Sequence, residues 1–401
     1  MTQWTKTRLT DKDCFEFLTG LWTGKTVPLE QAVVIRNTNF RNDGRLDLSD
    51  VAVLNVESRQ LATKRLEKGD IIIERSGGGP KQPVGRVCFF NETKDEPYSF
   101  SNFTSTLRIK DKQAFVPLFV HYYLLHLYMD GFTAPLQRAT TGIRNLDFGA
   151  YQQAEIPQPQ RTEQKKIAAL LWKLQRAIEV EEKLIATARE LKQSAMRQLF
   201  TRGLQGVAQK ETDIGPVPEN WRVDRLVEFA HFQRGYDITK KGQTHGTVPV
   251  VSSGGIRSWH DVAAASGPGV VIGRKGSIGT VHYVEQDFWP HDTTLFATDF
   301  CGNVPLFVYY RLCVLDLKRL DSGAANPALN RNFLHEELIS WPNADEQRDI
   351  AFILQTIDRK ISLHKSKCAT LQELFQTLLH KLMTGEIRVA DLDIDVSEVT
   401  Q

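Results

Sequence analysis

Apolar side chains recur at alternating steps of three and four residues in two long stretches of the chain, 156–205 and 342–385. This spacing places them on one face of an α-helix. The periodic part of each stretch begins after a proline, Pro159 or Pro342, and stops near a glycine, Gly203 or Gly385, with neither residue type in between. Helices begin and end in this way. Each is therefore predicted to form one helix of about 40 residues, roughly 60 Å long. The periodic positions include Ile167, Leu171, Leu174 and Ile178 in the first stretch and Ile350, Leu354, Ile357 and Ile361 in the second.

The two helical stretches are copies of one another. A shift of 183 positions superimposes Glu163-Gln164 on Glu346-Gln347 without a gap. This period is far longer than the ~20–50 residues of solenoid repeats, so one large module is used twice. An apolar stripe on an isolated helix is exposed to water, whereas two such stripes in one chain can cover each other. We therefore expect the helices to pair as a coiled coil. The alternative is that each helix packs separately on a domain core.

The segment before each helix predicts a mixed α/β domain. A buried strand at 71–73 leads into the basic glycine turn Arg75-Ser76-Gly77, and a strand at 270–272 leads into Arg274-Lys275-Gly276. A short helical stretch follows in both copies, and then a polar loop. The opening of the first copy has no close match in the opening of the second, so the repeat is expected only from about Gly69.

This pattern predicts an α+β fold with two globular domains on a pseudo-twofold repeat. The expected parts are a first domain at 1–155, a long helix at 156–205, a second domain at 206–341, a long helix at 342–385 and an acidic tail at 386–401. The tail has five acidic residues and one basic residue and is expected to be mobile.

Composition excludes several classes of protein. The 401 residues include 50 Lys and Arg against 48 Asp and Glu, a net charge of +2, which excludes a uniformly basic nucleic-acid binder but not a local basic face. No apolar run approaches the ~18 residues of a membrane helix. The five cysteines form no Cys-x-x-Cys pair and the N-terminus lacks an apolar signal core, so a reducing cytoplasm is expected.

Catalytic signatures are poor throughout the sequence. Gly267-Pro268-Gly269 precedes a strand rather than a helix, unlike a dinucleotide-binding loop. Gly77 to Lys81 lacks the spacing of a phosphate-binding loop, and His291-Asp292 has no further ligands at metal spacing. The sequence therefore predicts a chain that does no chemistry itself and binds no metal or cofactor.

Side chains suited to DNA recur instead in matched loops of the two domains. Arginine can pair with guanine and asparagine with adenine, while glycine turns, serine and threonine suit phosphate oxygens. The candidate residues are Arg36, Asn37, Asn39, Arg41, Arg75, Ser76, Gly77, Lys81, Arg138, Thr140, Thr141 and Arg144 in the first domain, and Ser252, Ser253, Arg257, Arg274, Lys275, Ser277, Asn326, Asn330 and Arg331 in the second.

The helix starts share the order proline, Glu-Gln and isoleucine, from Pro159 to Ile167 and from Pro342 to Ile350. With these starts, the long helices and the long spacing between them, the chain resembles the specificity subunit of type I restriction-modification systems. The resemblance covers essentially the whole chain. It implies two target-recognition domains that each read half of a bipartite, asymmetric site in double-stranded DNA, and an antiparallel coiled coil that sets their spacing.

The resemblance also implies partners and their cofactors. Two methyltransferase subunits bind such a scaffold and methylate adenine with S-adenosylmethionine, and restriction subunits that use ATP and Mg join for cleavage. The helix starts are then candidate partner contacts, namely Glu163, Gln164, Ile167, Glu346, Gln347 and Ile350. Two other classes stay open, a stand-alone DNA-modifying enzyme and a protein-interaction scaffold that uses only the coiled coil.

Overall fold

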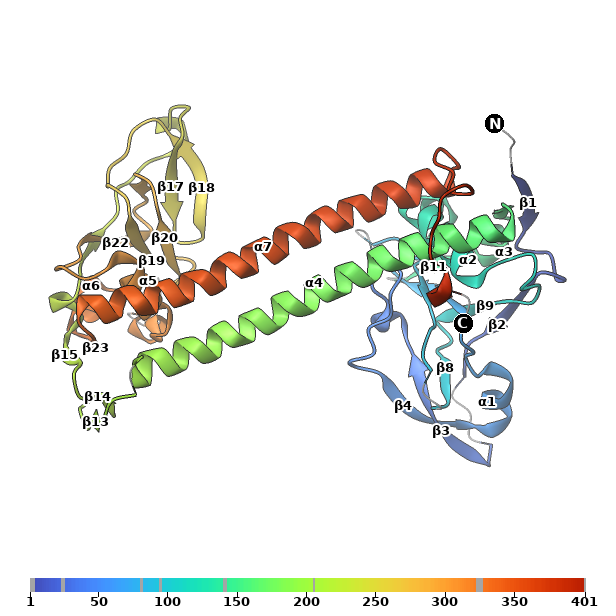
Figure 1. Cartoon of the computed structure of the whole chain (residues 1–401), viewed down its shortest axis with the longest axis horizontal. Coiled ribbons are helices and arrows are strands. Elements are labelled where there is room, and N and C mark those ends of the chain that lie inside the picture. The colour runs from blue at the N-terminus through green and yellow to red at the C-terminus, as the bar shows by residue number, and fades with distance from the viewer. Residues whose placement is uncertain are drawn as a thin grey trace. The chain divides into compact units, whose positions relative to one another are not determined.

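The chain divides into two units, residues 1–180 with 368–401, and residues 181–367. The computed structural model describes residues 4–22, 26–79, 82–93, 96–139, 143–204, 206–321 and 327–399. Each unit contains one α+β domain and one half of each of two long helices, α4 (Arg161–Arg202) and α7 (Ala344–Met383) (Figure 1). Among the described helices, none combines the length and the apolar character needed to cross a membrane.

The domain of the first unit is built on two sheets. A four-stranded antiparallel sheet has the order β2-β9-β5-β7, and a three-stranded sheet has the order β4-β3-β8 with β8 parallel to β3. Helix α2 packs on β7, and a small sheet β10-β11-β6 lies beside the glycine turn. The bounds are β2 (Phe15–Thr19), β3 (Leu29–Ile35), β4 (Ala52–Glu57), α1 (Ser58–Lys64), β5 (Ile71–Glu74), β6 (Ser76–Gly77), β7 (Val87–Phe89), β8 (Tyr98–Phe100), β9 (Thr104–Ile109), α2 (Pro117–Met129), β10 (Gln137–Ala139), β11 (Arg144–Leu146) and α3 (Phe148–Tyr151).

The domain of the second unit repeats this topology. Its four-stranded sheet has the order β16-β22-β19-β20, and its three-stranded sheet has the order β18-β17-β21, again with the last strand parallel. The central strands of both four-stranded sheets, β5 and β19, are fully buried, because both their faces are covered. The bounds are β13 (Gln209–Lys210), β14 (Val217–Pro218), β16 (His231–Arg234), β17 (Val248–Ser252), β18 (Gly255–His260), β19 (Gly269–Gly273), β20 (Val281–Val284), β21 (Trp289–Pro290), β22 (Thr294–Asp299), α5 (Pro305–Cys313) and α6 (Arg331–Glu336).

The repeat begins at the very start of each domain, so the expectation that it starts near Gly69 is wrong. In the first unit β1 (Thr5–Arg8) pairs antiparallel with β12 (Glu155–Gln158), and in the second β15 (Arg222–Arg225) pairs in the same way with β23 (Leu338–Trp341). Trp4 directly precedes β1 as Trp221 directly precedes β15. Because the first domain is longer, equivalent residues lie further apart in sequence at the domain starts than at the helices. A single ungapped shift therefore misses the match.

Helices α4 and α7 run antiparallel beside each other within the second unit. Glu181 of α4 contacts Lys367 of α7, and Lys192 contacts Asp358, so residue numbers rise along one helix as they fall along the other (Figure 1). The ends of both helices also enter the domain core, where Leu199 and Phe200 meet Ile350 and Leu354. The expected coiled coil is confirmed, and in the second unit its end is at the same time part of the domain core.

A polar cluster marks the middle of the helix pair. The carboxylate of Glu181, only 3 % exposed, accepts from Lys367 at 2.7 Å and lies 2.7 Å from Nδ1 of His364. The shift that superimposes the two helical stretches also places Glu181 on His364. They are thus equivalent positions that face each other at the centre of the pseudo-twofold repeat. The Lys367 ammonium, and after it His364, hold the pKa of Glu181 below its usual range.

Replacing Glu181 by glutamine is expected to make the stability of the helix centre less dependent on pH. A carboxyl group with a lowered pKa stabilises the folded state above its ordinary pKa, about 4.3, and loses this contribution as the pH falls through the lowered value. The wild-type chain is therefore expected to melt at a higher temperature than Glu181→Gln at pH 7, with the gap closing below about pH 4. Thermal unfolding followed by circular dichroism between pH 3 and 7 measures this gap, and a gap of constant size contradicts the assignment.

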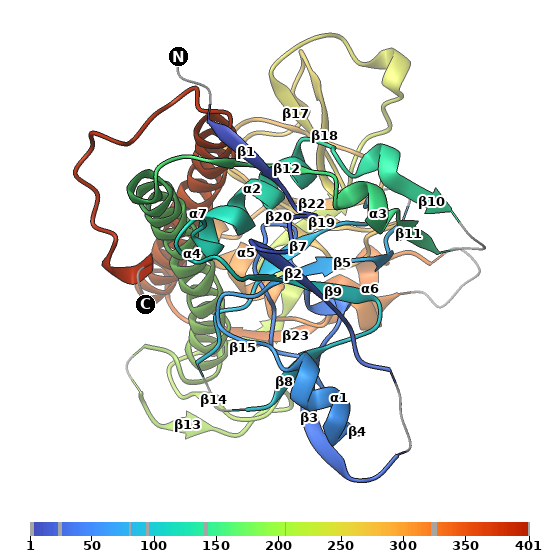
Figure 2. The same cartoon turned by 90° about the vertical axis from the view of Figure 1, so that its right-hand side faces the viewer.

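The acidic tail is packed along α4, contrary to the expectation that it is mobile. Arg388 forms a two-pronged ion pair with Glu163 at 2.6 and 2.7 Å. Lys166 donates to the carbonyl of Ala390 at 2.6 Å, and Asp395 lies 3.4 Å from Nζ of Lys173. Figure 2 shows the tail leaving α7 and returning to the side of α4. The segment 156–205 has ten basic and five acidic residues. The acidic tail therefore offsets part of the excess positive charge of this segment.

Candidate nucleic-acid interface

The two basic glycine turns have the same backbone structure. In the first unit the amides of Arg75 and Ser76 both donate to the carbonyl of Phe103, at 2.9 and 3.1 Å, and in the second the amides of Arg274 and Lys275 both donate to Thr293, at 2.8 and 3.1 Å. The carbonyl of each arginine accepts from a leucine amide, that of Leu146 or Leu329. Arg75 and Arg274 are therefore structurally equivalent.

Glycine is required in both turns. Gly77 and Gly276 have φ angles of 139° and 75°, which L-residues that carry a side chain rarely adopt. A Cβ on Gly77 would also lie 2.3 Å from Nδ2 of Asn37. The backbone of these turns can consequently approach a ligand without a side chain between them.

Several predicted residues of the first unit converge on the turn through the small sheet. Strand β11 pairs with β10 and with β6, which brings Arg144 opposite Gly77. The hydroxyl of Ser76 contacts Oδ1 of Asn145 at 2.5 Å, and Arg144 donates to Gln137 at 3.2 Å. Together these strands form a polar surface around the turn.

Two arginines flank this surface in different ways. The Arg75 guanidinium is stacked 4.5 Å above the ring of Phe148 and donates weakly to Ser105 at 3.4 Å. Arg138 is exposed and paired with Asp147. The backbone amide of Ala150, and then Arg138, lower the pKa of Asp147. Arg75 is thus held in place by an aromatic platform, a contact worth about 0.5–2 kcal/mol, whereas Arg138 is held by an ion pair at the surface.

Some residues of the loop after β3 are exposed, and others hold the loop in place from inside. The Asn37 amide donates to the carbonyl of Ser76 at 3.1 Å, which ties the loop to the glycine turn. Asn39 is 2 % exposed and its amide donates to the carbonyls of Asp47 and Asp50, so it supports the loop from inside. Arg36 is half-buried near Asp50, and Arg41 is exposed.

A hollow of about 720 Å³ lies between this loop and the glycine turn. Glu74 is one of its lining residues, and its fully buried carboxylate is bound by Arg86 at 2.7 and 2.9 Å. Arg86 also donates to the carbonyls of Asn37 and Phe40, so a buried ion pair holds the loop in position. The lining residues are Asn37, Thr38, Glu74, Gly77, Gly78, Gly79, Gln82 and Arg86.

The second unit assembles an equivalent surface from three segments. The Ser253 amide donates to the hydroxyl of Thr293 at 3.4 Å, which joins the β17–β18 hairpin to the turn at Arg274. Loop 327–331 is joined to the same turn because Leu329 donates to the Arg274 carbonyl. Ser252 and Ser253 are half-buried, and the exposed candidates are Arg257, Lys275, Ser277, Asn330 and Arg331. Asn330 also caps α6 by accepting from the amide of Asn332.

Four further candidates lie outside the described residues. They are Lys81, Thr140, Thr141 and Asn326.

The two helix-start glutamines, predicted to contact partners, are instead buried in the chain's own packing. Gln164 is fully buried, and its side chain accepts from the amide of Val116 at 2.8 Å and donates to the carbonyls of Ala114 and Pro159. Gln347 is 1 % exposed and binds the amide of Val304 at 2.9 Å. These glutamines satisfy backbone groups at the joint between domain and helix.

The helix-start glutamates are buried as well. Glu346, 6 % exposed, accepts from the amide of Leu204, just after α4, and from the indole of Trp221. Glu163, 2 % exposed, accepts from Arg388, just after α7. Ile167 and Ile350 are fully buried in the helix stripe. Each helix start therefore anchors the segment that follows the other helix.

Four apolar residues on the long helices are exposed: Leu191 and Leu374, which the three-four spacing predicts on the buried stripe, and Val180 and Leu363, which lie outside that stripe. Val180 and Leu191 on α4 are 51 % and 57 % exposed, and Leu363 and Leu374 on α7 are 67 % and 42 % exposed. The shift that superimposes Glu163 on Glu346 also places Val180 on Leu363 and Leu191 on Leu374. The repeat spacing itself could have identified Val180 and Leu363, since both copies retain an apolar residue outside the predicted stripe.

The known sequences that are similar to this chain are described as specificity domains or specificity subunits of type I restriction systems. The sequence model of the type I restriction modification DNA specificity domain matches residues 22–190 and 218–373. The MjaVIII type I restriction enzyme specificity subunit of Methanocaldococcus jannaschii is 25 % identical over 291 residues, 64 % of this chain and 68 % of that protein. The putative MjaX specificity subunit of the same organism is 22 % identical over 397 residues, covering 94 % and 92 %.

Solved structures share the fold. The S subunit of a type I restriction-modification system from M. genitalium superimposes with a TM-score of 0.66 at 19 % identity, covering 94 % of this chain and 96 % of that one. A chain from a study of the assembly and conformational transition of a type I R-M system superimposes with a TM-score of 0.54 at 16 % identity, covering 96 % and 99 %.

Proposed function

Because the chain belongs to the family of type I restriction modification DNA specificity domains, we propose that it is the non-catalytic subunit that selects the DNA site for a methyltransferase and nuclease complex. Each recognition domain reads one half of a bipartite, asymmetric site in double-stranded DNA. S-adenosylmethionine is used by the methyltransferase subunits, and ATP with Mg by the restriction subunits. The complex works where the chromosome is, in the cytoplasm.

The observation that carries this proposal is the equivalence of Arg75 and Arg274. Both follow a buried strand and precede a glycine of positive φ. Both are surrounded by other loops with exposed cationic and amide side chains, which differ between the two domains. Arginine reads guanine in the major groove by two hydrogen bonds, and different neighbouring loops fit two different half-sites.

The exposed apolar residues of the helices support docking of two partner copies. A single kind of methyltransferase subunit can bind the equivalent faces around Val180 and Leu191 on α4 and around Leu363 and Leu374 on α7. The helix starts, which the sequence predicts as partner contacts, are buried, and the docking surfaces are therefore these exposed faces.

Lengthening both helices is expected to lengthen the DNA spacer between the half-sites. Four residues inserted after Glu181 and four after His364, which are equivalent positions, add one turn of about 6 Å to each helix. The expected result is a spacer longer by about two base pairs, at ~3.4 Å per base pair. Methylome sequencing of cells that express the variant with its methyltransferase measures the spacer, and an unchanged spacer contradicts the role of the helices as a ruler.

Methylome sequencing with and without this gene tests the proposed function directly. Adenine methylation at one bipartite sequence is expected only when the chain and its methyltransferase are both expressed. Methylation by the purified chain alone would favour the stand-alone enzyme. Assembly with the methyltransferase without any sequence selectivity would favour a pure scaffold.

A further inference from the structure

A tyrosine of the second domain contacts an ion pair that links the two long helices. The Tyr310 hydroxyl of α5 donates to Oδ2 of Asp358 on α7 at 2.7 Å. Lys192 of α4 donates to both oxygens of Asp358 at 2.7 Å, and its ammonium lies 5.2 Å from the centre of the Tyr310 ring. Tyr310 is 2 % exposed, while the side chains of Lys192 and Asp358 are 21 % and 37 % exposed. We refer to Tyr310, Asp358 and Lys192 as the ionic junction.

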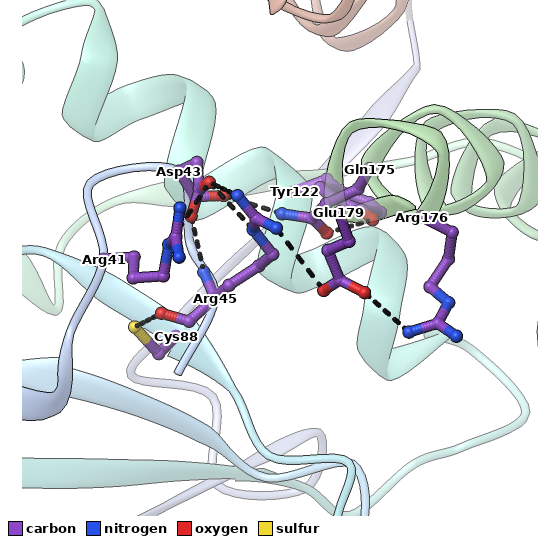
Figure 3. Close-up of polar contacts among 8 residues, drawn as sticks. All are labelled: Arg41, Asp43, Arg45, Cys88, Tyr122, Gln175, Arg176 and Glu179. Carbon is purple, nitrogen blue, oxygen red and sulfur yellow. Dashed lines mark hydrogen bonds and ion pairs between the residues drawn. The ribbon is translucent and has the colours of Figure 1, made fainter. Parts of the chain in front are cut away.

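The first unit has a neutral version of this junction. The Tyr122 hydroxyl of α2 donates to Gln175 of α4 at 2.9 Å, and the Tyr122 ring lies 6.0 Å from the Phe375 ring of α7. The shift that relates the two helices places Gln175 on Asp358 and Lys192 on Phe375. The amide of Gln175 also donates to the carbonyl of Asp43 at 2.8 Å, as Figure 3 shows. A tyrosine is present in both junctions. Its two partners are an amide and an aromatic ring in the first unit and an ion pair in the second.

The two junctions restrain their domains differently. In the first unit, Arg45 reinforces the contact by its ion pair with Asp43 and lies 3.6 Å from Glu179 of α4 (Figure 3). In the second unit, a hollow of about 560 Å³ beside Asp358 and Tyr310 is lined by His282 and Tyr283 of β20 and by residues of α7. The ionic junction therefore borders a hollow, whereas the contact of the helices with this domain is otherwise made by the apolar core that includes Ile350 and Leu354.

We propose that the ionic junction is a positioning device that fixes the orientation of the second recognition domain on the helix pair, and thereby the spacing accepted between the two half-sites. The inference rests on the proposed function, since spacing has a meaning only if the chain reads a bipartite site. Asp358 is the central residue because it binds both of the others. Charge-assisted hydrogen bonds are stronger and geometrically narrower than neutral ones, and they weaken when salt screens the exposed part of the pair.

The variant Asp358→Asn tests this device because it retains an acceptor for Tyr310 and removes the charge that holds Lys192. Purified complex of this chain with its methyltransferase is given duplexes whose spacer is native, or one base pair longer or shorter. Relative to wild type, we expect methylation of the shifted duplexes to rise about tenfold against the native duplex, the effect of losing one charge-assisted contact. Raising the salt concentration is expected to produce the same relaxation in the wild-type complex.

The chain supplies its own rescue variant. Asp358→Gln combined with Lys192→Phe installs the residues of the first unit, and it is expected to restore the selectivity for spacing and to remove its salt dependence. Lys360→Met changes an exposed cation on the same helix and is expected to leave selectivity unchanged. Lys192→Met provides a second way to break the pair if Asp358→Asn does not assemble.

The outcomes separate the inference from the proposed function. A wild-type complex that shows no preference for any spacer overturns the proposed function. A wild-type complex that prefers one spacer, together with equal preference in Asp358→Asn and Lys192→Met, overturns the positioning role. A lower melting temperature with unchanged preference also overturns it, because the contact would then serve stability only.

Discussion

Replacing Gln164 by alanine is expected to destabilise the first unit by about 3–5 kcal/mol. The side chain accepts from one backbone amide and donates to two carbonyls, at 2.8 to 3.0 Å, and it is fully buried. Each buried polar group left without a partner costs roughly 1–3 kcal/mol. These backbone groups lie at the joint between the domain and α4. The loss of stability is therefore expected to affect the whole domain and not only the end of the helix. Thermal and urea unfolding of the variant measure the effect.

Gln347→Ala is the matched variant in the second unit. Its side chain accepts from the amide of Val304 and donates to the carbonyl of Pro342 and to Oδ1 of Asn303, and a loss of similar size is expected there. The control is Gln193→Ala at an exposed position of α4, where a change within about 0.5 kcal/mol is expected. Equal effects at buried Gln164 and exposed Gln193 would contradict the anchoring role.

Arg75→Ala and Arg274→Ala are each expected to weaken binding of the assembled complex to its DNA site by about 1–3 kcal/mol, or roughly 5- to 150-fold. Each arginine belongs to one domain, so each variant is expected to relax selectivity in one half-site and to leave the other unchanged. Binding to duplexes with every single substitution in the site measures this selectivity.

The stacking ring provides the control for Arg75. Phe148→Leu keeps the charge of Arg75 but removes the platform 4.5 Å below it, so an intermediate loss of affinity is expected. If Arg75 contacts a phosphate instead of a base, Arg75→Ala will weaken binding to all sequences equally and reduce the salt dependence by about one charge. Unchanged affinity in both arginine variants would contradict the recognition role of the glycine turns.

The elements with strong local signals were predictable from sequence. The three-four spacing of Ile167 and Leu171 predicts a helix because it depends only on the helical repeat. The basic glycine turn at Arg75 was predictable because a short buried strand, a basic residue and a glycine follow directly in sequence. The long-period repeat then predicted that Arg274 has the equivalent place, and the structure has the same backbone hydrogen bonds at both turns.

The direction in which side chains point was not predictable. The Glu-Gln pair at each helix start has the polarity of an exposed partner contact, yet Gln164 and Gln347 are buried because they bind backbone groups of a loop 48 and 43 residues away in the chain. Asn39 was expected at the DNA surface for its amide, but that amide supports the loop from inside. In each case the partner is distant in sequence.

By itself the sequence determined the two helices, the duplication, the α+β class and the two arginine turns, since each depends on periodicity, spacing or neighbouring residues. Only the tertiary structure decided that the repeat extends back to Trp4, that the acidic tail lies on α4, and that an ion pair stands in one unit where an amide and a ring stand in the other. These features arise from contacts between residues far apart in the chain, and hydrogen bonding and burial depend on which surfaces the fold brings together.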